Sequence, residues 1–522
     1  MMKIFTLMLA AFLMTSMTAH SQWTDDYGSN TQITPTGLGY YESEMKTNND
    51  GITYVFFIVP SGETLSMRLQ ILDKDGNKIL SRGGKTISQE ANKTWTVMNQ
   101  YLMVDNEGNA IIAVPDFRTA PEEMLSTYTI YKYSPDGTQL WSGVTLNGGI
   151  GYDAAAGLTM CLSDDGGYVF AYEYTDASAQ KDFVRVEKLD KDGTSVWNKV
   201  IAEDGYFNVP YPYIFNAGDG NIMVLYVYGG GSEIKSHVMN SDGETLYSEN
   251  NTVYSEGLAS SKVWEVMHIN PGPDNGALIT CVNSSYNGVF SYIKKDGTPA
   301  FVSGTKGVTL NDSYASGEPA AVYCSKDNSF ICSYKPFDYD NSSYQGLYLK
   351  KISITGESLW TTSIPVEEMK DDYKYSYCSI RNLTEDNVAL FYQKYDNTTA
   401  VVNSFVVTYD NEGNKVGDAL QFSTTSTTKE NLRSSELIDG SYFITMWDEK
   451  RNGSNYTLYM QKVPVDAAAG IKSVDVNTEK NIIDTEYYTI SGERLTGPMK
   501  GVNIVRCVYD DNTIVTRKVV IK

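Results

Sequence analysis

Residues 167–197 have the sequence GYVFAYEYTDASAQKDFVRVEKLDKDGTSVW, and this stretch decides the fold. A glycine turn is followed by a nearly continuous apolar segment, an alternating segment, a second turn at Gly193 and a tryptophan four residues later. Turns of this kind between strand-like segments join antiparallel neighbours, because glycine tolerates the positive φ that the turn needs. The stretch therefore predicts consecutive strands of a β-meander.

Both turns of this stretch recur along the chain. The first turn, each time followed by an apolar segment, occurs at Gly51, Gly108, Gly167, Gly220, Gly276, Asn328, Asn387 and Gly440. The second turn occurs at Gly76, Gly137, Gly193, Gly243, Gly297, Gly356 and Gly413. The unit is roughly 55 residues long, which is in the range of propeller blades. An apolar strand beside an alternating one is typical of a sheet packed between neighbouring sheets.

The two ends of the repeat predict how many blades there are. The eighth unit has no fourth strand after residues 456–463, and residues 22–28, QWTDDYG, resemble a fourth strand without its partners. Pairing these two ends would close the ring and remove the exposed sheet edges. We therefore expect an all-β chain with a β-propeller of about eight four-stranded blades over residues 22–465, with seven blades as the alternative.

The first residues resemble a signal peptide. Lys3 precedes an apolar stretch over residues 4–14, and Ala19-His20-Ser21 has the small-x-small pattern of a cleavage site. We place the signal peptide at residues 1–21, with cleavage before Gln22. The apolar stretch is shorter than the roughly 20 residues that span a bilayer, so we expect no transmembrane segment. The mature protein is expected to be extracellular or on the outer cell surface.

Composition argues against some partners and does not decide whether the cysteines form disulfides. The net charge is -22, which argues against nucleic acid as a partner. Six cysteines in 522 residues are too sparse for a disulfide framework. Cys324 and Cys332 flank a predicted tight turn, so we name them as the one pair to test for a disulfide.

Aromatic residues occupy a repeated place after the second turn. Trp141, Trp197 and Trp360 each stand four residues after a turn glycine, and Tyr247 and Phe301 take the equivalent positions. We expect these side chains to be packing anchors in the fourth strand of each blade. The DG-x-x-x-Trp units resemble the repeats of quinoprotein-type propellers. They also resemble the Asp-box of sialidases, but they lack a residue of that motif, so no activity is transferred from either family.

The pattern changes after Val465. Residues 466–473 are expected to be a linker, and residues 474–522 a small C-terminal β-sandwich-like module. This module resembles the C-terminal sorting domain of the type IX secretion pathway. The matching elements are Tyr488, Gly492, Lys500, Gly501 and Lys518. The resemblance implies contact with that secretion machinery and export across the outer membrane.

No catalytic or metal-binding motif is visible in the sequence. His237 and His268 lie in predicted strands, without metal-ligand or nucleophile-base spacing. The turns that begin at Asp73 and Asp190 resemble the start of a calcium loop but lack its later ligands, so we interpret them as hairpin turns. We expect no cofactor and no metal.

The long connections between strands are rich in tyrosine. In a meander blade the tight turns share one face, and the long connections share the other. Long loops on a rigid scaffold are where binding usually resides, and tyrosine suits contact with sugars or peptides. The candidate binding residues of this loop-rich face are Tyr206, Tyr211, Tyr213, Tyr314, Tyr339, Tyr344, Tyr373 and Tyr375.

Three functions are compatible with these features. We expect a non-enzymatic binding protein whose ligand on the loop-rich face is a glycan or another extracellular protein. The alternative is a carbohydrate-active hydrolase or lyase, which needs two carboxylates in the central pocket; a cluster of two carboxylates with an arginine or tyrosine at the loop-rich end of the axis would favour it. A third possibility is a scaffold in a larger surface complex, which an exposed apolar patch on the blade edges would support.

Overall fold

The structure is a computed structural model of the whole chain. It describes residues 23–521 except 41, 92–100, 117–126, 147–156, 177–178, 206–207, 209, 248–249, 261–266, 312–314, 339–342, 345, 369–372, 452–454, 466–481, 490–491 and 510–513. The predicted signal peptide and linker lie outside this part. Two compact units emerge, residues 1–470 and residues 471–522.

The first unit is a β-propeller of eight blades, each an antiparallel meander built around four strands. Blade 1 contains β2 (Ser43–Thr47), β3 (Thr53–Ser61), β4 (Thr64–Leu72) and β5 (Lys85–Ala91). Blade 2 contains β6 (Tyr101–Val104), β7 (Ala110–Asp116), β8 (Thr127–Tyr133) and β9 (Gln139–Thr145). Blade 3 contains β10 (Leu158–Leu162), β11 (Tyr168–Asp176), β12 (Lys181–Leu189) and β13 (Ser195–Gly205). Blade 4 contains β14 (Tyr213–Gly218), β15 (Asn221–Tyr228), β16 (Glu233–Met239) and β17 (Asn251–Tyr254).

Blades 5 to 8 repeat the arrangement. Blade 5 contains β18 (Met267–Pro271), β19 (Ala277–Val282), β20 (Gly288–Ile293) and β21 (Val308–Thr309). Blade 6 contains β22 (Ala315–Cys324), β23 (Ser329–Asp338), β25 (Gly346–Ser353) and β26 (Ile364–Glu368), with the short β24 (Ser343–Tyr344) beside β23. Blade 7 contains β27 (Tyr373–Asn382), β28 (Asn387–Asp396), β29 (Val402–Asp410) and β30 (Lys415–Ser423). Blade 8 contains β31 (Lys429–Ser434), β32 (Tyr442–Glu449), β33 (Thr457–Pro464) and β1 (Thr31–Gln32).

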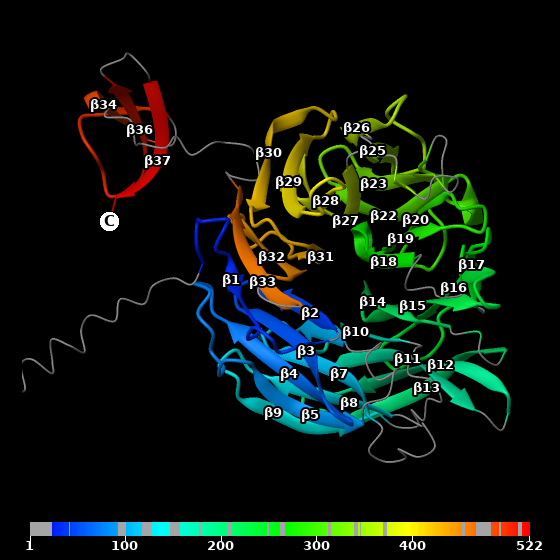
Figure 1. The fold of residues 1–522 in the computed structure, drawn as a ribbon. Helices are drawn as coiled ribbons and strands as arrows, with labels where there is room; N and C mark the ends of the chain where they lie inside the picture. Colours follow the sequence, from blue (N-terminus) through cyan, green and yellow to red (C-terminus); the bar gives the residue numbers. More distant parts are fainter. Residues whose placement is uncertain are drawn as a thin grey trace, which may run out of the picture. The chain divides into compact units, whose positions relative to one another are not determined.

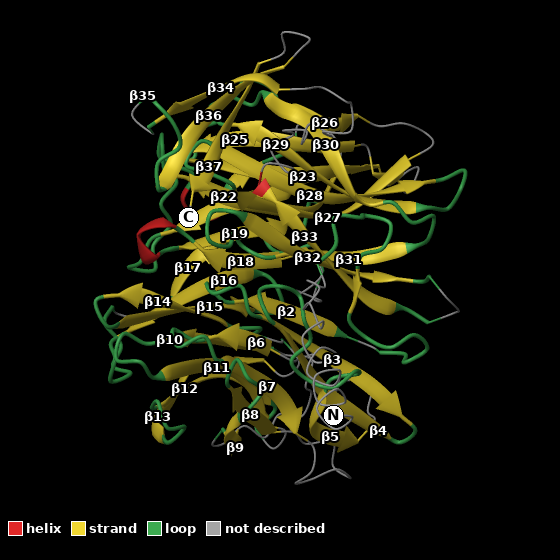
Figure 2. Ribbon diagram, turned by 90° about the vertical axis from the view of Figure 1, so that its left-hand side faces the viewer, coloured by secondary structure: helices red, strands yellow, loops and turns green. Residues whose placement is uncertain are grey.

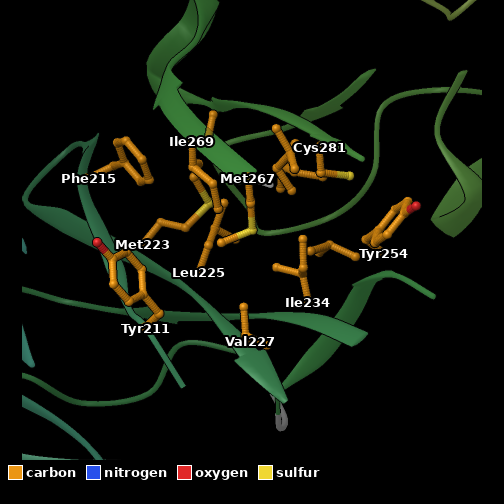
Figure 3. Close-up of a cluster of buried hydrophobic side chains, with 14 of the residues drawn as sticks. Tyr211, Phe215, Met223, Leu225, Val227, Ile234, Tyr254, Met267, Ile269 and Cys281 are labelled. Carbon is orange, nitrogen blue, oxygen red and sulfur yellow. The ribbon is translucent and has the colours of Figure 1, made fainter. Parts of the chain in front are cut away.

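The hydrophobic core is divided among the interfaces between blades. The described residues form eight buried clusters, and each contains residues of two neighbouring blades, from blades 1 and 2 around to blades 8 and 1. Figure 3 shows the cluster between blades 4 and 5, where Leu225 and Val227 of β15 lie with Met267 and Ile269 of β18. Every blade therefore buries both of its faces, which is why the second strand of each unit is apolar throughout.

The ring closes between the two ends of the propeller (Figure 1). Thr31 and Gln32 pair with Met460 and Tyr459 of β33, so the N-terminal segment supplies the outermost strand of blade 8. The predicted closure and the count of eight blades are therefore confirmed. The paired residues lie a few positions after the predicted QWTDDYG segment, in which Trp23 instead donates a hydrogen bond from Nε1 to the Lys74 carbonyl of blade 1 at 3.0 Å.

A half-buried arginine and a buried asparagine hold the N-terminal segment in place. The Arg451 guanidinium donates to the carbonyl of Ser29 at 2.7 Å and forms an ion pair with the buried Glu449 at 2.9 Å. The Asn30 amide donates to Gln461 Oε1 of β33 at 2.7 Å. The closing strand has only two residues, so these side-chain bonds supplement its short ladder.

The second turn of each blade behaves as the sequence predicted. All seven turn glycines have φ between 72° and 93°. In the turn at Gly193, Asp190 Oδ1 accepts the backbone N–H groups of Asp192 and Thr194 at 2.9 and 2.8 Å. The carboxylate that resembled a calcium ligand thus caps its own hairpin turn. Figure 2 shows that strands and loops make up nearly all of the described chain, with only short helical turns.

The second unit is a small β-sheet. Its four strands, β34 (Ile482–Tyr488), β35 (Arg494–Leu495), β36 (Gly501–Tyr509) and β37 (Ile514–Ile521), lie in the order β35-β34-β36-β37. Glu486 forms ion pairs with Arg494 and Arg506 at 2.7 and 2.5 Å. In the described residues this is a single sheet, and the second sheet of the expected sandwich is not seen there.

Candidate functional site

The innermost strand of each blade lies beside the axis of the ring. Figure 1 shows β2, β10, β14, β18, β27 and β31 around the centre. Neighbouring inner strands contact each other, as in the pairs β2 and β6, β10 and β14, and β27 and β31. The strands of a meander alternate in direction, so the tight turns lie at one end of the axis, the turn end, and the long connections lie at the other, the loop end.

A cavity of about 850 Å³ follows the inner strands of blades 1 to 5 toward the turn end. Its volume is within the roughly 300–1,000 Å³ of small-molecule sites. Asparagine amides alternate in its wall with apolar side chains, and a few charged groups join them. The lining includes Lys46, Met103, Asn106, Met160, Asp164, Tyr213, Phe215, Asn216, Asn270 and Asn275. Such a wall can both hydrogen-bond and stack against a ligand.

A second cavity, of about 600 Å³, continues around the axis along β18, β22 and β27. Asn270 belongs to the walls of both cavities. Arg381 forms an ion pair with Glu436 at 3.4 Å and donates to the carbonyls of Ser434 and Ser435 at 3.0 and 3.2 Å. This guanidinium is therefore engaged within the protein.

Charged side chains gather at the loop end of the axis, where blades 8 and 1 meet. We name this group the axial acid cluster, and it consists of Tyr40, Glu42, Glu44, Glu430, Asn431, Arg433 and Asp448. Arg433 Nη1 of β31 donates to Ser43 Oγ of β2 at 3.1 Å, and Asn431 Nδ2 donates to Asp448 Oδ2 at 2.5 Å. Residues nearly 400 positions apart in sequence thus form one group.

Arg433 is the cation at the centre of this cluster. Its positive charge acts on the carboxyls of Glu42, Glu44 and Asp448 and lowers the pKa of each. Burial is the larger effect in all three, and the net result is a pKa above the ordinary value for each of these carboxyls. One guanidinium therefore does not compensate the three carboxyls around it.

Glu44 is the most perturbed of these carboxyls. Burial raises its pKa to about 7, while Lys46, Arg433 and the backbone N–H of Leu102 act in the opposite direction. Its Oε2 atom is buried and has no hydrogen-bond partner among the described residues. Buried acceptors usually have a donor, so this oxygen is an exception to that rule.

Asp448 and Tyr40 form the other part of the cluster. Asp448 is buried, with 5% of its surface exposed, and its carboxylate lies beside the Tyr40 hydroxyl. Burial raises the pKa of Tyr40 well above its ordinary value, and the neighbouring Asp448 charge raises it further. The phenol is therefore a stable hydrogen-bond donor at neutral pH.

Glu44 occupies a position at which no other blade has a carboxylate. The register of each inner strand against its neighbour identifies the equivalent residues. These are Tyr101, Thr159, Tyr213, His268, Ser379 and Ser434, and blade 6 has alanines there, Ala320 and Ala321. Blade construction does not require an acid at this place. Glu44 is therefore best explained by a role other than folding.

The candidate tyrosines are distributed unevenly. Tyr211 is 9% exposed and packs in the core between blades 4 and 5, which corrects its expected surface position. Tyr213 is half-buried and reaches the wall of the larger cavity. Tyr206, Tyr314 and Tyr339 lie outside the described residues, and Tyr344, Tyr373 and Tyr375 lie in strands at places where side chains are not described.

The aromatic anchors pack against the next blade. The ring of Trp141 lies against Gly193, that of Trp197 against Gly243 and that of Trp360 against Gly413. The approach is close, because a Cβ atom added to Gly193 would lie 3.2 Å from the Trp141 indole. Phe301 packs in the same way against Gly356. Tyr247 differs, because 48% of it is exposed.

The possible disulfide between Cys324 and Cys332 is not formed. Cys324 and Cys332 are both free thiols. In the hairpin register Cys324 pairs with Ser329, whereas Cys332 pairs with Ala321. Cys324 belongs to the core between blades 6 and 7 and Cys332 to the core between blades 5 and 6, so they lie on opposite faces of the sheet.

The two histidines have different surroundings. His237 Nδ1 lies 2.7 Å from Asn250 Oδ1, and burial lowers its pKa. His268 lines the second cavity. Within the described residues, no group of three His, Cys, Asp or Glu side chains is arranged to hold a metal ion.

The blade edges carry single apolar side chains. Ile79, Leu140, Val196, Leu246 and Leu359 are 39–56% exposed, and each stands three residues after a turn glycine. These residues come from five blades, and blades 3 and 4 expose a second one, Val200 and Tyr247. Scattered apolar side chains of this kind are ordinary on protein surfaces.

In the C-terminal unit, the elements that resemble a sorting domain have defined places. Tyr488 ends β34 and its hydroxyl donates to Glu486 Oε2 at 2.9 Å, and Gly492 has φ of 87° in the turn that follows. Gly501 begins β36 and pairs with Ile521, and Lys500 and Lys518 are exposed. No helix in the part of the chain that is described has the length and apolar character to cross a membrane.

Comparisons with protein-family models and with curated proteins give no match. Among solved structures, the BP39L lectin from Burkholderia pseudomallei is 11% identical, with a TM-score of 0.46 over 73% of this chain and 97% of the lectin. A PL25 ulvan lyase is 11% identical, with a TM-score of 0.42 over 85% and 96% of the two chains. The arabinofuranosidase Arb93A from Fusarium graminearum is 12% identical, with a TM-score of 0.37 over 62% and 98%. At these values the likenesses carry no information on the ligand of this chain.

Sequence reasoning did not identify the axial acid cluster. Its members come from the segment before β2 and from β2, β31 and β32, at the two ends of the propeller sequence. The available signal was Glu44 itself, a charged residue in an inner strand where the other repeats have uncharged side chains or histidine.

Proposed function

We propose that this chain is an exported glycan-binding β-propeller whose ligand occupies the axis of the ring. The observation that carries the proposal is the cavity of about 850 Å³ lined by the inner strands of five blades. Its asparagine amides suit the hydroxyl groups of a sugar, and the half-buried Tyr213 suits the apolar face of a pyranose.

The axial acid cluster extends this site toward the loop end. Lys46 lines the cavity and Glu44 lies two residues before it, on the same face of β2. Residues two apart on one strand are separated by about 7 Å. The carboxylates and the cavity are therefore neighbouring parts of one axial site.

A binding screen tests this proposal. The mature protein is offered a panel of immobilised polysaccharides, and retained protein is measured together with released sugar. We expect retention without release for at least one polysaccharide, and at least tenfold weaker retention when Asn270, in the wall of both cavities, is changed to leucine. Asn455→Leu is the matched control, since Asn455 is exposed near residue 37, away from these cavities. Retention that does not respond to Asn270→Leu would contradict an axial site.

A carbohydrate-active hydrolase or lyase is the second candidate. Glu44 and Asp448 are two carboxyls with raised pKa values, next to Arg433 and Tyr40, and such groups can donate and accept protons near neutral pH. Released sugar in the same screen, lost in Glu44→Gln, would establish this activity instead of simple binding.

We also propose that the signal peptide and the C-terminal unit direct export to the outside of the cell. The resemblance of residues 474–522 to type IX sorting domains supports this, as does their formation of a separate compact unit. A chain that ends at residue 465 should accumulate in the periplasm of a type IX-competent host, while the full chain reaches the surface or medium. Equal export of both chains would contradict the proposal.

A further inference from the structure

Blade 4 departs from a packing rule that five other junctions follow. At those junctions, the residue four positions after a second-turn glycine lies against the second-turn glycine of the next blade. These residues are Leu80, Trp141, Trp197, Phe301 and Trp360, and Trp23 lies in the same way against Gly76 where the ring closes. In blade 4 the residue is Tyr247, but a Cβ atom added to Gly297 of blade 5 would meet Ser236 and Val238 instead. Tyr247 is therefore not used to dock blade 5.

Tyr247 lines a cavity in place of packing against a blade. Ser236 is buried at the place that the ring would take, and its Oγ donates to the Gly297 carbonyl at 2.6 Å. The Tyr247 side chain is 48% exposed and borders a cavity of about 610 Å³, which we name the rim cavity. No described residue forms a hydrogen bond or a ring contact with this side chain. Its aromatic face is therefore available to a ligand.

The rim cavity is built from the tight turns of three blades. Its wall includes Asn221 and Tyr247 of blade 4, Asp274, Tyr292, Lys294, Lys295 and Asp296 of blade 5, and Thr355 of blade 6. The backbone N–H of Gly297 donates to the Lys294 carbonyl at 2.8 Å, which fixes the second turn of blade 5. The volume of the cavity is within the range of small-molecule sites.

The charges of this wall cancel, and some of them are unused. Lys294 and Lys295 face the cavity together with Asp274 and Asp296. Lys295 is engaged, because its ammonium forms an ion pair with Asp219 at 2.9 Å. Lys294 and Asp274 are exposed, and the side chain of neither has a hydrogen bond or an ion pair with a described residue. One donor and one acceptor are therefore available in the same cavity.

The first turn of blade 5 separates the rim cavity from the axial cavity. Within the described chain, Asp274 and Asn275 are the one consecutive pair of non-glycine residues with positive φ, at 51° and 58°. This conformation is uncommon outside glycine, and it often occurs where a side chain has to be aimed at a site. Asp274 lines the rim cavity, whereas Asn275 lines the axial cavity. The two cavities share no residue, so they can bind ligands independently.

We infer that the rim cavity is a second glycan site, which binds a neutral saccharide against the ring of Tyr247. A pyranose has an apolar face that stacks on an aromatic ring, and hydroxyl groups that both donate and accept hydrogen bonds. The Asp274 carboxylate accepts from one hydroxyl, and the Lys294 ammonium donates to another. A strongly charged ligand of either sign would meet a like charge in this wall, and such contacts are unfavourable.

The test uses the full mature chain and a panel of methyl glycosides of glucose, galactose, mannose, rhamnose and xylose. Methyl glycosides of glucuronic acid and glucosamine are the charged counterparts, and affinity is measured by saturation-transfer NMR titration at millimolar sugar. We expect a neutral glycoside to bind at least fivefold more weakly to Tyr247→Ala, and within twofold of the wild type to Tyr247→Phe, which keeps the ring. Asp274→Asn keeps a residue that tolerates positive φ and should weaken binding at least threefold.

Two control variants make the outcome decisive. Leu246→Ala removes a side chain that is 40% exposed at the neighbouring position and lies outside the cavity wall, so it should leave the affinity unchanged. Asn270→Leu alters the axial cavity and should also leave this affinity unchanged. Tyr247→Ala should melt at the wild-type temperature, because its ring is not packed.

The two proposed sites fail in different ways. Full affinity of every bound glycoside in both Tyr247→Ala and Asp274→Asn, or no binding of any glycoside by the wild-type chain, would overturn the rim site. A charged glycoside that binds more tightly than its neutral counterpart would overturn its ligand class. Binding that depends on Tyr247, in a chain whose polysaccharide retention does not respond to Asn270→Leu, would support the rim site and contradict only the axial one.

Discussion

Charged side chains occur in two settings in this propeller, and the two differ in how often they recur. In blades 2, 3 and 6 a lysine five residues before the turn glycine bonds an aspartate of its own blade: Lys132 with Asp105, Lys188 with Asp165 and Lys351 with Asp327, at 2.5–2.9 Å. At the loop end of the axis, the carboxyls around Arg433 occur once. A charge that recurs at one place in several blades stabilises the blade structure, whereas a charge that occurs once needs another explanation.

The recurrent lysines also connect neighbouring blades. Lys132 reaches the Tyr168 hydroxyl of blade 3 at 2.6 Å, and Lys351 reaches the Asn411 carbonyl of blade 7 at 2.8 Å. Their charges are fully engaged within the protein. Glu44 Oε2, in contrast, has no protein donor in the described residues. This difference separates groups that hold the ring together from a group that has no such partner.

The largest expected effect concerns the closure of the ring. Arg451→Met leaves Glu449 buried with a weaker partner and removes the bonds to residues 28–30. We expect a loss of about 3 kcal/mol in the free energy of unfolding, because breaking a buried pair exposes one charge to an apolar environment. Urea denaturation followed by tryptophan fluorescence measures it. A change below about 0.5 kcal/mol would mean that the N-terminal strand is not held by this contact.

The next effect concerns the aromatic anchors. Trp141→Ala removes a side chain that is 7% exposed and packs against Gly193 of blade 3, so we expect a loss of about 3 kcal/mol. Leu140→Ala, at the neighbouring position with 47% exposure, is the matched control and should stay within about 0.5 kcal/mol of the wild type. Similar losses in both variants would show that the outer strand, and not the anchor, is responsible.

A pH series should separate Glu44 from the recurrent charges. Its pKa is raised from 4.5 to about 7, so the folded state binds more protons than the unfolded state between these values. Protonation of Glu44 therefore stabilises the folded state at low pH, and this contribution to the free energy of unfolding is lost as pH rises through 7. Glu44→Gln should be more stable than the wild type by up to about 3 kcal/mol at about pH 8 and nearly equal to it at about pH 4, as thermal melts would reveal. A difference that does not depend on pH would mean that folding leaves the pKa of Glu44 unchanged.

The smallest effect concerns the turns that resemble calcium loops. Asp190→Ala removes two hydrogen bonds from the turn at Gly193 and should cost about 1 kcal/mol. Addition of EDTA or calcium should leave the melting temperature of the wild-type chain unchanged. A shift on calcium addition that disappears in Asp190→Ala would identify a metal site in place of a capped turn.

The sequence predicts the scaffold well because the scaffold repeats. Eight apolar strands and seven glycine turns define the blades, and the tryptophan four residues after Gly137 or Gly193 packs where the repeat places it. The pairing register of the hairpin that contains Cys324 and Cys332 was not predictable, because it depends on the conformation of the turn. Asn328 adopts φ of 57° and pairs Cys324 with Ser329, which places the thiols on opposite faces.

The candidate site was less predictable for a physical reason. Glu44 and Arg433 are brought near each other only when blade 8 docks beside blade 1, and a period of roughly 55 residues does not indicate which inner-strand residues converge. Tyr211 also escaped prediction, since its φ of 41° turns the side chain into the core between blades 4 and 5.

The most direct measurement is the affinity of a neutral polysaccharide for three proteins that are folded under the same conditions: wild type, Glu44→Gln and Lys351→Met. We predict that Glu44→Gln binds at least tenfold more weakly while its stability is unchanged or higher, and that Lys351→Met loses stability but keeps the wild-type affinity. Full affinity in Glu44→Gln together with reduced affinity in Lys351→Met would contradict the assignment of binding to the axis.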